Sequence, residues 1–298
     1  MTDRQTNVLL LGGSGQLGQE ILRAAWPAHI RVHAPTRELL ALTDKDAVEA
    51  AFRAKSYAAV INAAAFTAVD NAETRASEAF AVNATGAGIV AQAARNAGAA
   101  VVHISTDYVF DGALTRAYRE DDDPSPPNVY GESKLAGERA VISSNARSVI
   151  LRTAWLISPY GSNFLKTILR LSATGGPIRV VDDQIGNPTS AADLAATIVS
   201  IVLGLIDQPT APTGLFNFVN AGEASWHELA QAIVAADGGD PAMVQAIPTL
   251  AFPTPAARPP NSRLDTSRIR VDYGIIPRPW RQIVPGIVTE ARLKEKSR

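Results

Sequence analysis

The chain has 298 residues, of which 46% are apolar and 19% charged, and its formal net charge is −1. This balance is typical of a globular protein and gives no electrostatic reason to bind nucleic acid or an acidic membrane surface. Cysteine is absent, which excludes disulfides, thiolate metal sites and a cysteine nucleophile. No apolar run reaches the roughly 18 residues of a membrane span, and the polar start lacks a signal-peptide core. We therefore expect a cytoplasmic protein with neither a nucleic-acid nor a membrane partner.

In the first half of the chain, short β-rich runs alternate with alanine-rich amphipathic stretches. Strands that alternate with helices favour a parallel sheet covered on both faces, the α/β Rossmann-type doubly wound fold. Strands are predicted at Val8–Leu11, Ile30–His33, Ala59–Ile61, Val101–Ile104 and Val149–Leu151, and helices at Gln16–Ala25, Asp44–Ala54, Asn71–Ala97 and Val129–Ser143.

After about Trp155 the pattern becomes irregular and is punctuated by glycine and proline. Helices are still predicted at Ala191–Leu205 and Ser225–Ala236, and a strand at Leu215–Val219. We predict a Rossmann domain of residues 1–155 with parts of 190–220. A smaller C-terminal α/β domain of residues 156–190 and 221–298 would close over the end of the sheet.

The segment LLLGGSGQLG runs from the first predicted strand through glycines into the first helix. Glycine permits a tight turn and a close approach of the backbone to a pyrophosphate, and the helix N-terminus attracts the anion. A structural turn is the alternative, but the strand–loop–helix context favours dinucleotide binding. The candidate contacts are Gly12, Gly15, Gln16, Leu17 and Gly18.

The sequence leaves the choice of nicotinamide cofactor open between NADPH and NADH. An NAD site usually has an acid at the end of the second strand, whereas this strand is followed by His33-Ala34-Pro35-Thr36-Arg37-Glu38. Arg37 could pair with a 2′-phosphate, or it could be a surface arginine paired with Glu38. We expect NADPH to be accepted at least as well as NADH.

Two further segments suggest a catalytic site. The fourth strand ends in HISTDYVFDG, so Ser105, Thr106 and Asp107 should face the ligand crevice. The segment VYGESKLAGE places Tyr130 and Lys134 on one helix face, about 6 Å apart along the axis.

A hydroxyl, a phenol and an ammonium group that converge suit the reduction of a carbonyl. Lys134 would lower the pKa of Tyr130, whose phenol would protonate the reduced oxygen, and Thr106 would hydrogen-bond that oxygen. Lys134 could also hold the nicotinamide ribose. A capping threonine and a solvent-facing Tyr/Lys pair are the structural alternatives.

The chain resembles the extended short-chain dehydrogenases/reductases and, within them, the dTDP-4-dehydrorhamnose reductase family. The resemblance runs nearly end to end, and its most specific segments are VVDDQIGNPTSAADLA and ARPPNSRLDTS. The others are GGSGQLG, NAAAFTAVDNAE, STDYVFDG, YGESKLAGE, RTAW and GSNF.

The resemblance implies reduction of the C4 ketone of dTDP-4-dehydro-6-deoxy-L-mannose to dTDP-L-rhamnose with NADPH or NADH. It implies that Thr106, Tyr130 and Lys134 are catalytic, and that Ala63, Ala64 and Ala65 let the backbone approach the cofactor. It further implies a substrate site in the smaller domain, with Trp155 over the sugar, Asn163 on the nucleotide sugar, and Gln184, Asn187 and Arg258 around the dTDP moiety. Arg258 suits a diphosphate on chemical grounds as well, whereas core packing is the alternative for Trp155.

Some relatives form dimers bridged by magnesium, and Glu20, Asp193 and Glu290 could be the matching acids. We expect a monomer or a homodimer. Departures from the family lie in Arg152–Ile157, which lacks a serine and a tyrosine, and in Leu40–Asp44, which lacks one acid.

Two other functions remain open at this point: a non-catalytic regulatory subunit, and a related nucleotide-sugar epimerase or dehydratase. A regulatory subunit without catalytic activity would not need Thr106, Tyr130 and Lys134 together. A dehydratase would want an Asp-Glu pair after the threonine, where this chain has Asp107 and Tyr108.

Overall fold

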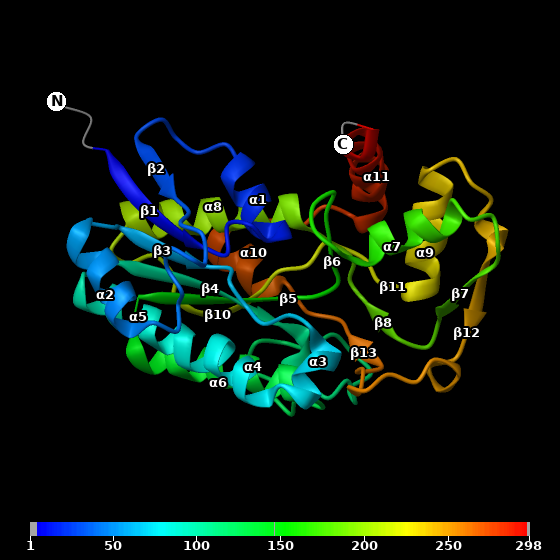
Figure 1. Ribbon diagram of the computed structural model, residues 1–298, viewed down its shortest axis with the longest axis horizontal. Helices are drawn as coiled ribbons and strands as arrows, with labels where there is room; N and C mark the ends of the chain where they lie inside the picture. Colours follow the sequence, from blue (N-terminus) through cyan, green and yellow to red (C-terminus); the bar gives the residue numbers. More distant parts are fainter. Residues whose placement is uncertain (1–4, 146, 297–298) are drawn as a thin grey trace.

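The computed structural model describes residues 5–145 and 147–296 (Figure 1). Its centre is a six-stranded parallel sheet in the order β10-β5-β4-β3-β1-β2. The order reverses between β1 and β3, and ligands of doubly wound sheets bind outside the strand ends at such a point. The strands are β1 (Thr6–Leu11), β2 (Ile30–His33), β3 (Ala59–Asn62), β4 (Ala100–Thr106), β5 (Ser148–Thr153) and β10 (Gly214–Asn217).

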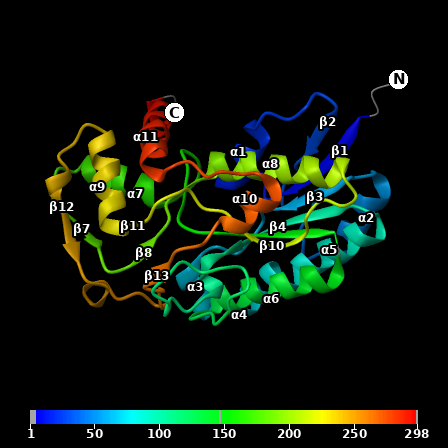
Figure 2. The same cartoon turned by 180° about the vertical axis from the view of Figure 1, so that it is seen from behind.

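Helices cover both faces of this sheet, which confirms the predicted Rossmann-type fold. Figures 1 and 2 show α1 and α8 on one face and α2, α5 and α6 on the other. Strand β1 packs against the helices on both faces of the sheet. Val8 and Leu10 pack with the α1/α8 cluster, whereas Leu9 and Leu11 pack with the α2/α5 cluster. The helices are α1 (Gln16–Arg23), α2 (Lys45–Ala54), α5 (Ala87–Asn96), α6 (Val129–Ser144) and α8 (Ala191–Asp207).

A smaller lobe with its own hydrophobic cluster lies beyond the carboxyl ends of the strands, on the right of Figure 1. Its helices are α7 (Phe164–Ser172), α9 (Trp226–Ala236) and α11 (Trp280–Lys296). Its strand pairs are short: β6 (Leu156–Ile157) with β9 (Thr189–Ser190), β7 (Ile178–Val181) with β12 (Val244–Ile247), and β8 (Ile185–Gly186) with β11 (Ala224–Ser225) and β13 (Asn261–Ser262). Helix α10 (Ser267–Tyr273) and the 3₁₀ turns η2 (Asp107–Val109), η3 (Pro241–Met243) and η4 (Thr249–Ala251) complete the fold.

The helix predicted over Asn71–Ala97 is wrong as a single element. The segment forms α3 (Val69–Thr74), α4 (Ala76–Phe80), the π-helical turn η1 (Ala81–Gly86) and α5. Arg75, at φ −124°, separates the first two helices. In the π turn, the buried Asn83 accepts a hydrogen bond from the Phe66 amide at 2.8 Å and donates to the Phe66 carbonyl at 3.1 Å. Contacts with a distant loop therefore accompany the π turn, which continues directly from α4 into α5, whereas the break in the helix lies at Arg75.

Among the helices of residues 5–145 and 147–296, none is both long enough and apolar enough to cross a bilayer.

Candidate active site

The glycine loop follows β1 and leads into α1, as predicted. Gly12 has φ +84°, and a Cβ atom there would lie 2.6 Å from the Ala64 nitrogen and 2.7 Å from the Ala63 carbonyl carbon. Only glycine therefore lets the loop lie against the end of β3. Gly15 is the N-cap of α1 and offers no side chain to cap it, so the first amide groups of the helix are left for an anion.

A cavity of about 910 Å³ opens at the carboxyl ends of the strands. It joins the glycine loop to the end of β4, to helix α6 and to the first residues after β5. Its lining includes the following predicted site residues: Gly12, Gly15, Gln16, Leu17, Gly18, Arg37, Ala63, Ala64, Ala65, Ser105, Thr106, Asp107, Tyr130, Lys134 and Trp155.

Helix α6 carries Tyr130 and Lys134 to this cavity. The Asn128 side chain caps the helix by accepting a hydrogen bond from the Gly131 amide at 2.8 Å. Lys134 is buried, and its Nζ donates to the Ile104 carbonyl of β4 at 2.6 Å, which anchors the helix to the strand that ends in Thr106. The Thr106 hydroxyl donates to the Asp107 carboxylate at 3.0 Å. The three predicted catalytic side chains thus lie around one cavity.

Burial dominates the titration of these groups. It raises the pKa of Tyr130 to about 12, although a hydrogen bond with Thr106 opposes the rise. The prediction that Lys134 lowers the pKa of Tyr130 is therefore wrong for the protein without ligands, because burial raises this pKa and the further groups that affect it are Thr106 and Asp107. Burial also lowers the pKa of Lys134 to about 8, with Glu138 opposing, and raises that of Asp107 to about 6.

Several cavity residues were not predicted from the sequence, among them Arg75, Glu78, Tyr108 and Trp226. Tyr108 contacts Tyr130 edge to face, with ring centroids 5.8 Å apart. Its place directly after Asp107 at the end of a strand was a usable signal. Trp226 is the first residue of α9. Apart from the Trp155–Ser162 segment, every other cavity residue is more than 70 positions away from it in the sequence. No local sequence pattern therefore points to Trp226.

Asn163 joins the two lobes. It is the N-cap of α7, accepting from the Lys166 amide at 3.2 Å, and its Nδ2 donates to the Gln16 side chain of the glycine loop at 3.2 Å. Ser162, its neighbour, lines the cavity. Asn163 therefore stands beside the glycine-loop end of the cavity.

The side chains predicted to surround the dTDP moiety form hydrogen bonds or ion pairs with other parts of the protein; they are Gln184, Asn187 and Arg258. Gln184 donates to the Thr249 hydroxyl at 3.0 Å, and Asn187 donates to the Gly222 carbonyl at 2.8 Å. Arg258 pairs with Asp70, whose Oδ2 lies 2.9 Å from its Nη2. Within residues 5–145 and 147–296, the residues that line the cavity do not include these three or Asn163.

Each of the three acids predicted as magnesium ligands lies close to an arginine side chain. Glu20 and Glu290 both approach Arg23, at 3.5 and 2.6 Å, whereas Asp193 pairs with Arg278. Among the residues that the structure describes, no group of three or more His, Cys, Asp or Glu side chains is arranged to hold a metal ion. The site suggested by the family resemblance would bridge two copies of the chain, and in that form it stays a prediction.

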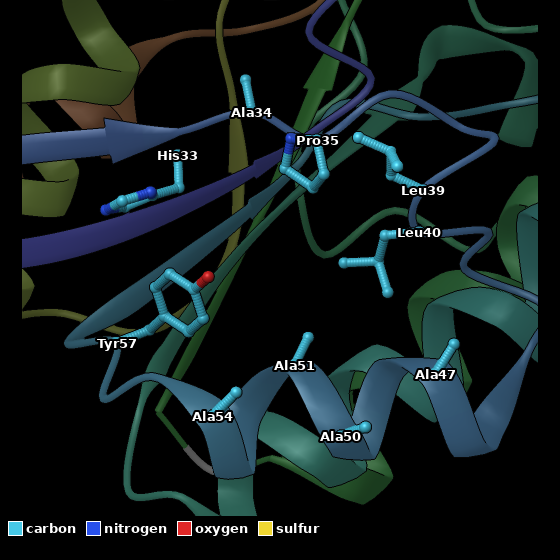
Figure 3. A pocket seen from close by; sticks show the side chains of 10 residues that line it. All are labelled: His33, Ala34, Pro35, Leu39, Leu40, Ala47, Ala50, Ala51, Ala54 and Tyr57. Carbon is cyan, nitrogen blue, oxygen red and sulfur yellow. The ribbon is translucent and has the colours of Figure 1, made fainter.

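A second hollow, of about 620 Å³, lies between β2 and α2 (Figure 3). One wall is a row of α2 alanines, and Leu39 and Leu40 lie opposite. The His33 ring contacts Asn7 at 3.0 Å and Lys55 at 3.1 Å. The larger cavity is the better candidate for an active site, because more ionisable side chains converge there than in the second hollow.

Comparison with known proteins agrees with this geometry. The family model described as "RmlD substrate binding domain" matches residues 6–293. A dTDP-4-dehydrorhamnose reductase of Streptomyces griseus is 42% identical, with 92% of this chain and 90% of the relative covered, and one of Aggregatibacter actinomycetemcomitans is 37% identical, with 94% and 97% covered. The crystal structure of the dTDP-4-dehydrorhamnose reductase of Bacillus anthracis in complex with NADP superposes with a TM-score of 0.90 at 34% identity, covering 96% of this chain and 99% of that one. The chain therefore belongs to the RmlD substrate-binding family, together with relatives named dTDP-4-dehydrorhamnose reductase.

Proposed function

We propose that this protein reduces the C4 ketone of dTDP-4-dehydro-6-deoxy-L-mannose to dTDP-L-rhamnose, the last step of dTDP-rhamnose biosynthesis, with NADPH or NADH as hydride donor. The observation that carries the proposal is the meeting of Thr106, Tyr130 and Lys134 in the cavity that the glycine loop also lines. Residues 1–155 with parts of 190–220 would bind the cofactor. Residues 156–190 and 221–298 would bind the nucleotide sugar.

The residues at the end of β1 fit a dinucleotide. The Gly12–Ala64 contact leaves no room for a side chain, and the uncapped N-terminus of α1 faces the same cavity as a site for the pyrophosphate. Arg37, which lines the cavity after β2, would pair with a 2′-phosphate. Lys134 would hold the nicotinamide ribose.

When bound, the cofactor supplies a hydride to C4 of the sugar. The ketone oxygen then becomes an alkoxide, and the Tyr130 phenol gives it a proton. A pKa of about 12 keeps the phenol protonated at neutral pH, so the acid form is the resting form. An alkoxide is more basic than a phenolate, so the transfer runs toward the sugar. Lys134 stabilises the phenolate that remains.

Thr106 requires a rearrangement to assist this step. In the free protein its hydroxyl proton is directed to Asp107. To hydrogen-bond the ketone oxygen, the hydroxyl would rotate away from Asp107 toward the substrate, where it would orient the carbonyl and stabilise the developing charge.

The test measures NADPH consumption by absorbance with the 4-keto-6-deoxy-L-sugar nucleotide as substrate. The wild type should turn over, and Tyr130→Phe should lose on the order of 10²-fold or more in kcat because it lacks the proton donor. Tyr57→Phe, in the second hollow, is the matched control and should retain activity.

Two outcomes would contradict the proposal. Turnover unaffected by Tyr130→Phe would remove Tyr130 from its role while leaving the reaction in place. A well-folded wild type that binds NADPH but does not turn over would favour a regulatory subunit.

A further inference from the structure

Helix α6 carries three ionisable side chains that lie one turn apart along one face: Tyr130, Lys134 and Glu138. Lys134 therefore has a phenol on its N-terminal side and a carboxylate on its C-terminal side. Lys134 and Glu138 are each 2% exposed, so water screens their charges little. An ammonium and a carboxylate at this spacing on a helix attract each other. In this structure, however, each of them binds a different strand.

The two strands are neighbours in the central sheet. The Lys134 Nζ donates to the Ile104 carbonyl of β4 at 2.6 Å. Glu138 accepts two hydrogen bonds from Arg152 of β5, one from Nε to Oε1 at 2.9 Å and one from Nη2 to Oε2 at 2.7 Å. Both carboxylate oxygens are thus held by one guanidinium, whose planar fork matches them. Glu138 is directed to β5, and Lys134 reaches β4 two residues before Thr106.

Arg152 is itself fixed on its other sides. Its side chain is 2% exposed, its guanidinium carbon lies 4.9 Å from the centroid of the Phe110 ring, and its Nη1 donates to the Glu120 carbonyl at 3.4 Å. In the sheet it lies opposite Ser105, the residue before Thr106. Among the described residues, those that line the cavity do not include Arg152. A fixed cation therefore stands behind the end of β4, outside the cavity.

The ionisable groups around Lys134 come from α6, from β4 with the turn η2, and from β5: Tyr130, Glu138, His103, Asp107, Tyr108 and Arg152. Burial lowers the pKa of His103 well below its usual value and raises the pKa of both tyrosines, so these three are neutral near pH 8. Burial raises the pKa of Asp107 to about 6, so its carboxylate is already ionised there. The charges of Glu138 and Arg152 can therefore be tested through the titration of Lys134.

We propose that Arg152 is a positioning residue for the reduction: by binding both oxygens of Glu138, it keeps this carboxylate from pairing with Lys134 and leaves the ammonium beside Tyr130. The inference rests on the proposed function, since it takes Lys134 as the cation that serves the phenol and the nicotinamide ribose. Without Arg152, the carboxylate would draw Lys134 toward the C-terminal part of α6, away from the cavity. A displacement of about 1 Å at a catalytic site can cost on the order of 10²-fold in rate.

Arg152→Gln removes the cation and keeps an amide that can donate to Glu138. Its kcat should fall about 10- to 100-fold, because Lys134 leaves its place. In the wild type, kcat/KM for NADPH should decline near pH 8, where Lys134 loses its proton. In Arg152→Gln this decline should move to higher pH, because the released carboxylate stabilises the ammonium.

Glu138→Gln should move the same decline in the opposite direction, to lower pH. The Lys134 cation then loses the carboxylate that opposes its deprotonation and keeps the guanidinium of Arg152 as a neighbour. At pH values below the decline, kcat should stay close to that of the wild type, because no carboxylate draws Lys134 away from Ile104. The double variant Glu138→Gln/Arg152→Gln should regain most of the kcat that Arg152→Gln loses. An ion pair with a purely structural role would not move the decline in opposite directions.

Asp237→Asn is the matched control, because it breaks a two-bond pair with Arg292 in the smaller lobe. It should lower stability and leave the pH of the decline unchanged. If Arg152→Gln does not fold, Arg152→Lys decides the matter: an ammonium lacks the fork, so kcat should fall and should recover when Glu138→Gln is added. A decline that stays in place or moves in the same direction in both single variants, or an unchanged kcat in the folded Arg152 variant, would overturn the inference.

Binding of NADPH separates this inference from the proposed function. If the wild type binds NADPH, as followed by nicotinamide fluorescence, but does not turn over the nucleotide sugar, the proposed reaction fails. The pH dependence of the NADPH dissociation constant then tests Arg152 alone. Its midpoint should still move to higher pH in Arg152→Gln and to lower pH in Glu138→Gln, and midpoints that do not move would overturn the inference.

Discussion

Lys134 is the candidate catalytic residue whose charge changes within the pH range in which the protein can be assayed. It is buried, donates to a backbone carbonyl and has its pKa lowered to about 8 by desolvation, which the carboxylate of Glu138 only partly offsets. At neutral pH the side chain is still mostly protonated. It loses its charge within the range in which the protein can be assayed, whereas Tyr130, with a pKa of about 12, does not ionise there.

The pH profile of kcat/KM for NADPH should therefore have a descending limb with its midpoint near 8. Because the folded-state pKa of Lys134 is below its ordinary value, the cation is present below pH 8 and is lost above it. Lys134→Arg should be less active but should lack this limb, since guanidinium does not deprotonate in this range. Assays from about pH 6 to pH 10, with circular dichroism to confirm folding, measure it. A flat wild-type profile, or a limb retained in Lys134→Arg, would contradict the assignment.

At the scale of elements, helix α6 is positioned by close contact with the π turn η1. Gly137 lies against it: a Cβ atom at this position would be 2.0 Å from the Asn83 carbonyl oxygen. The Asn83 side chain also donates to the Ser133 hydroxyl at 2.9 Å, and that hydroxyl donates to the Tyr130 carbonyl at 2.8 Å. The π turn thus connects the loop after β3 to the helix that carries Tyr130 and Lys134.

Gly137→Ala should consequently destabilise the protein by about 1–3 kcal/mol, because the added methyl forces α6 away from η1. It should also lower kcat, since Tyr130 and Lys134 move with the helix. Gly286→Ala, in α11 with open space around the added methyl, is the matched control and should be neutral or stabilising by about 0.5–1 kcal/mol. Urea unfolding of both variants gives the comparison. Equal stabilities would show that the backbone contact is not rigid.

The six strands of the central sheet could be predicted from the sequence because buried parallel strands are continuous apolar runs with short punctuation. The π turn within the helix predicted at Asn71–Ala97 could not be predicted, because its Asn83 forms hydrogen bonds with Phe66, 17 positions away in the sequence. The convergence of Thr106, Tyr130 and Lys134 on one cavity was predictable from strand ends and helix spacing. The pKa of Tyr130 and the place of Trp226 in the cavity depend on burial and on the position of α9, which local sequence does not encode.

At the scale of the whole molecule, a strap of residues 254–260 holds the smaller lobe against the Rossmann part. Asp70 accepts hydrogen bonds from the Ala256 amide at 3.2 Å and from Arg258 at 2.9 Å. Asn128, the cap of α6, donates to the Ala257 carbonyl at 2.8 Å. The arginine that the sequence suggests for a diphosphate is therefore occupied by a carboxylate when no ligand is bound.

Asp70→Asn should strengthen the binding of dTDP, because it removes the anion that competes with the diphosphate for Arg258. The pair is partly exposed, with 18% of the Arg258 and 40% of the Asp70 side chain accessible, so its loss should change stability by at most about 1 kcal/mol. The same energy corresponds to a gain in dTDP affinity of up to about 5-fold, which should shrink as salt is added.

Calorimetric titration of dTDP at low and high salt measures this gain, and Asp272→Asn, which removes the partner of Arg268 on α10, is the matched control. Weaker binding by Asp70→Asn would contradict the competition and show that Asp70 orients the guanidinium for the phosphate. Unchanged binding would instead show that Arg258 does not reach the diphosphate, and that its contact with Asp70 serves only to hold the strap. The expected increase, absent in the control, would mean that the nucleotide sugar replaces a contact between the lobes as it binds.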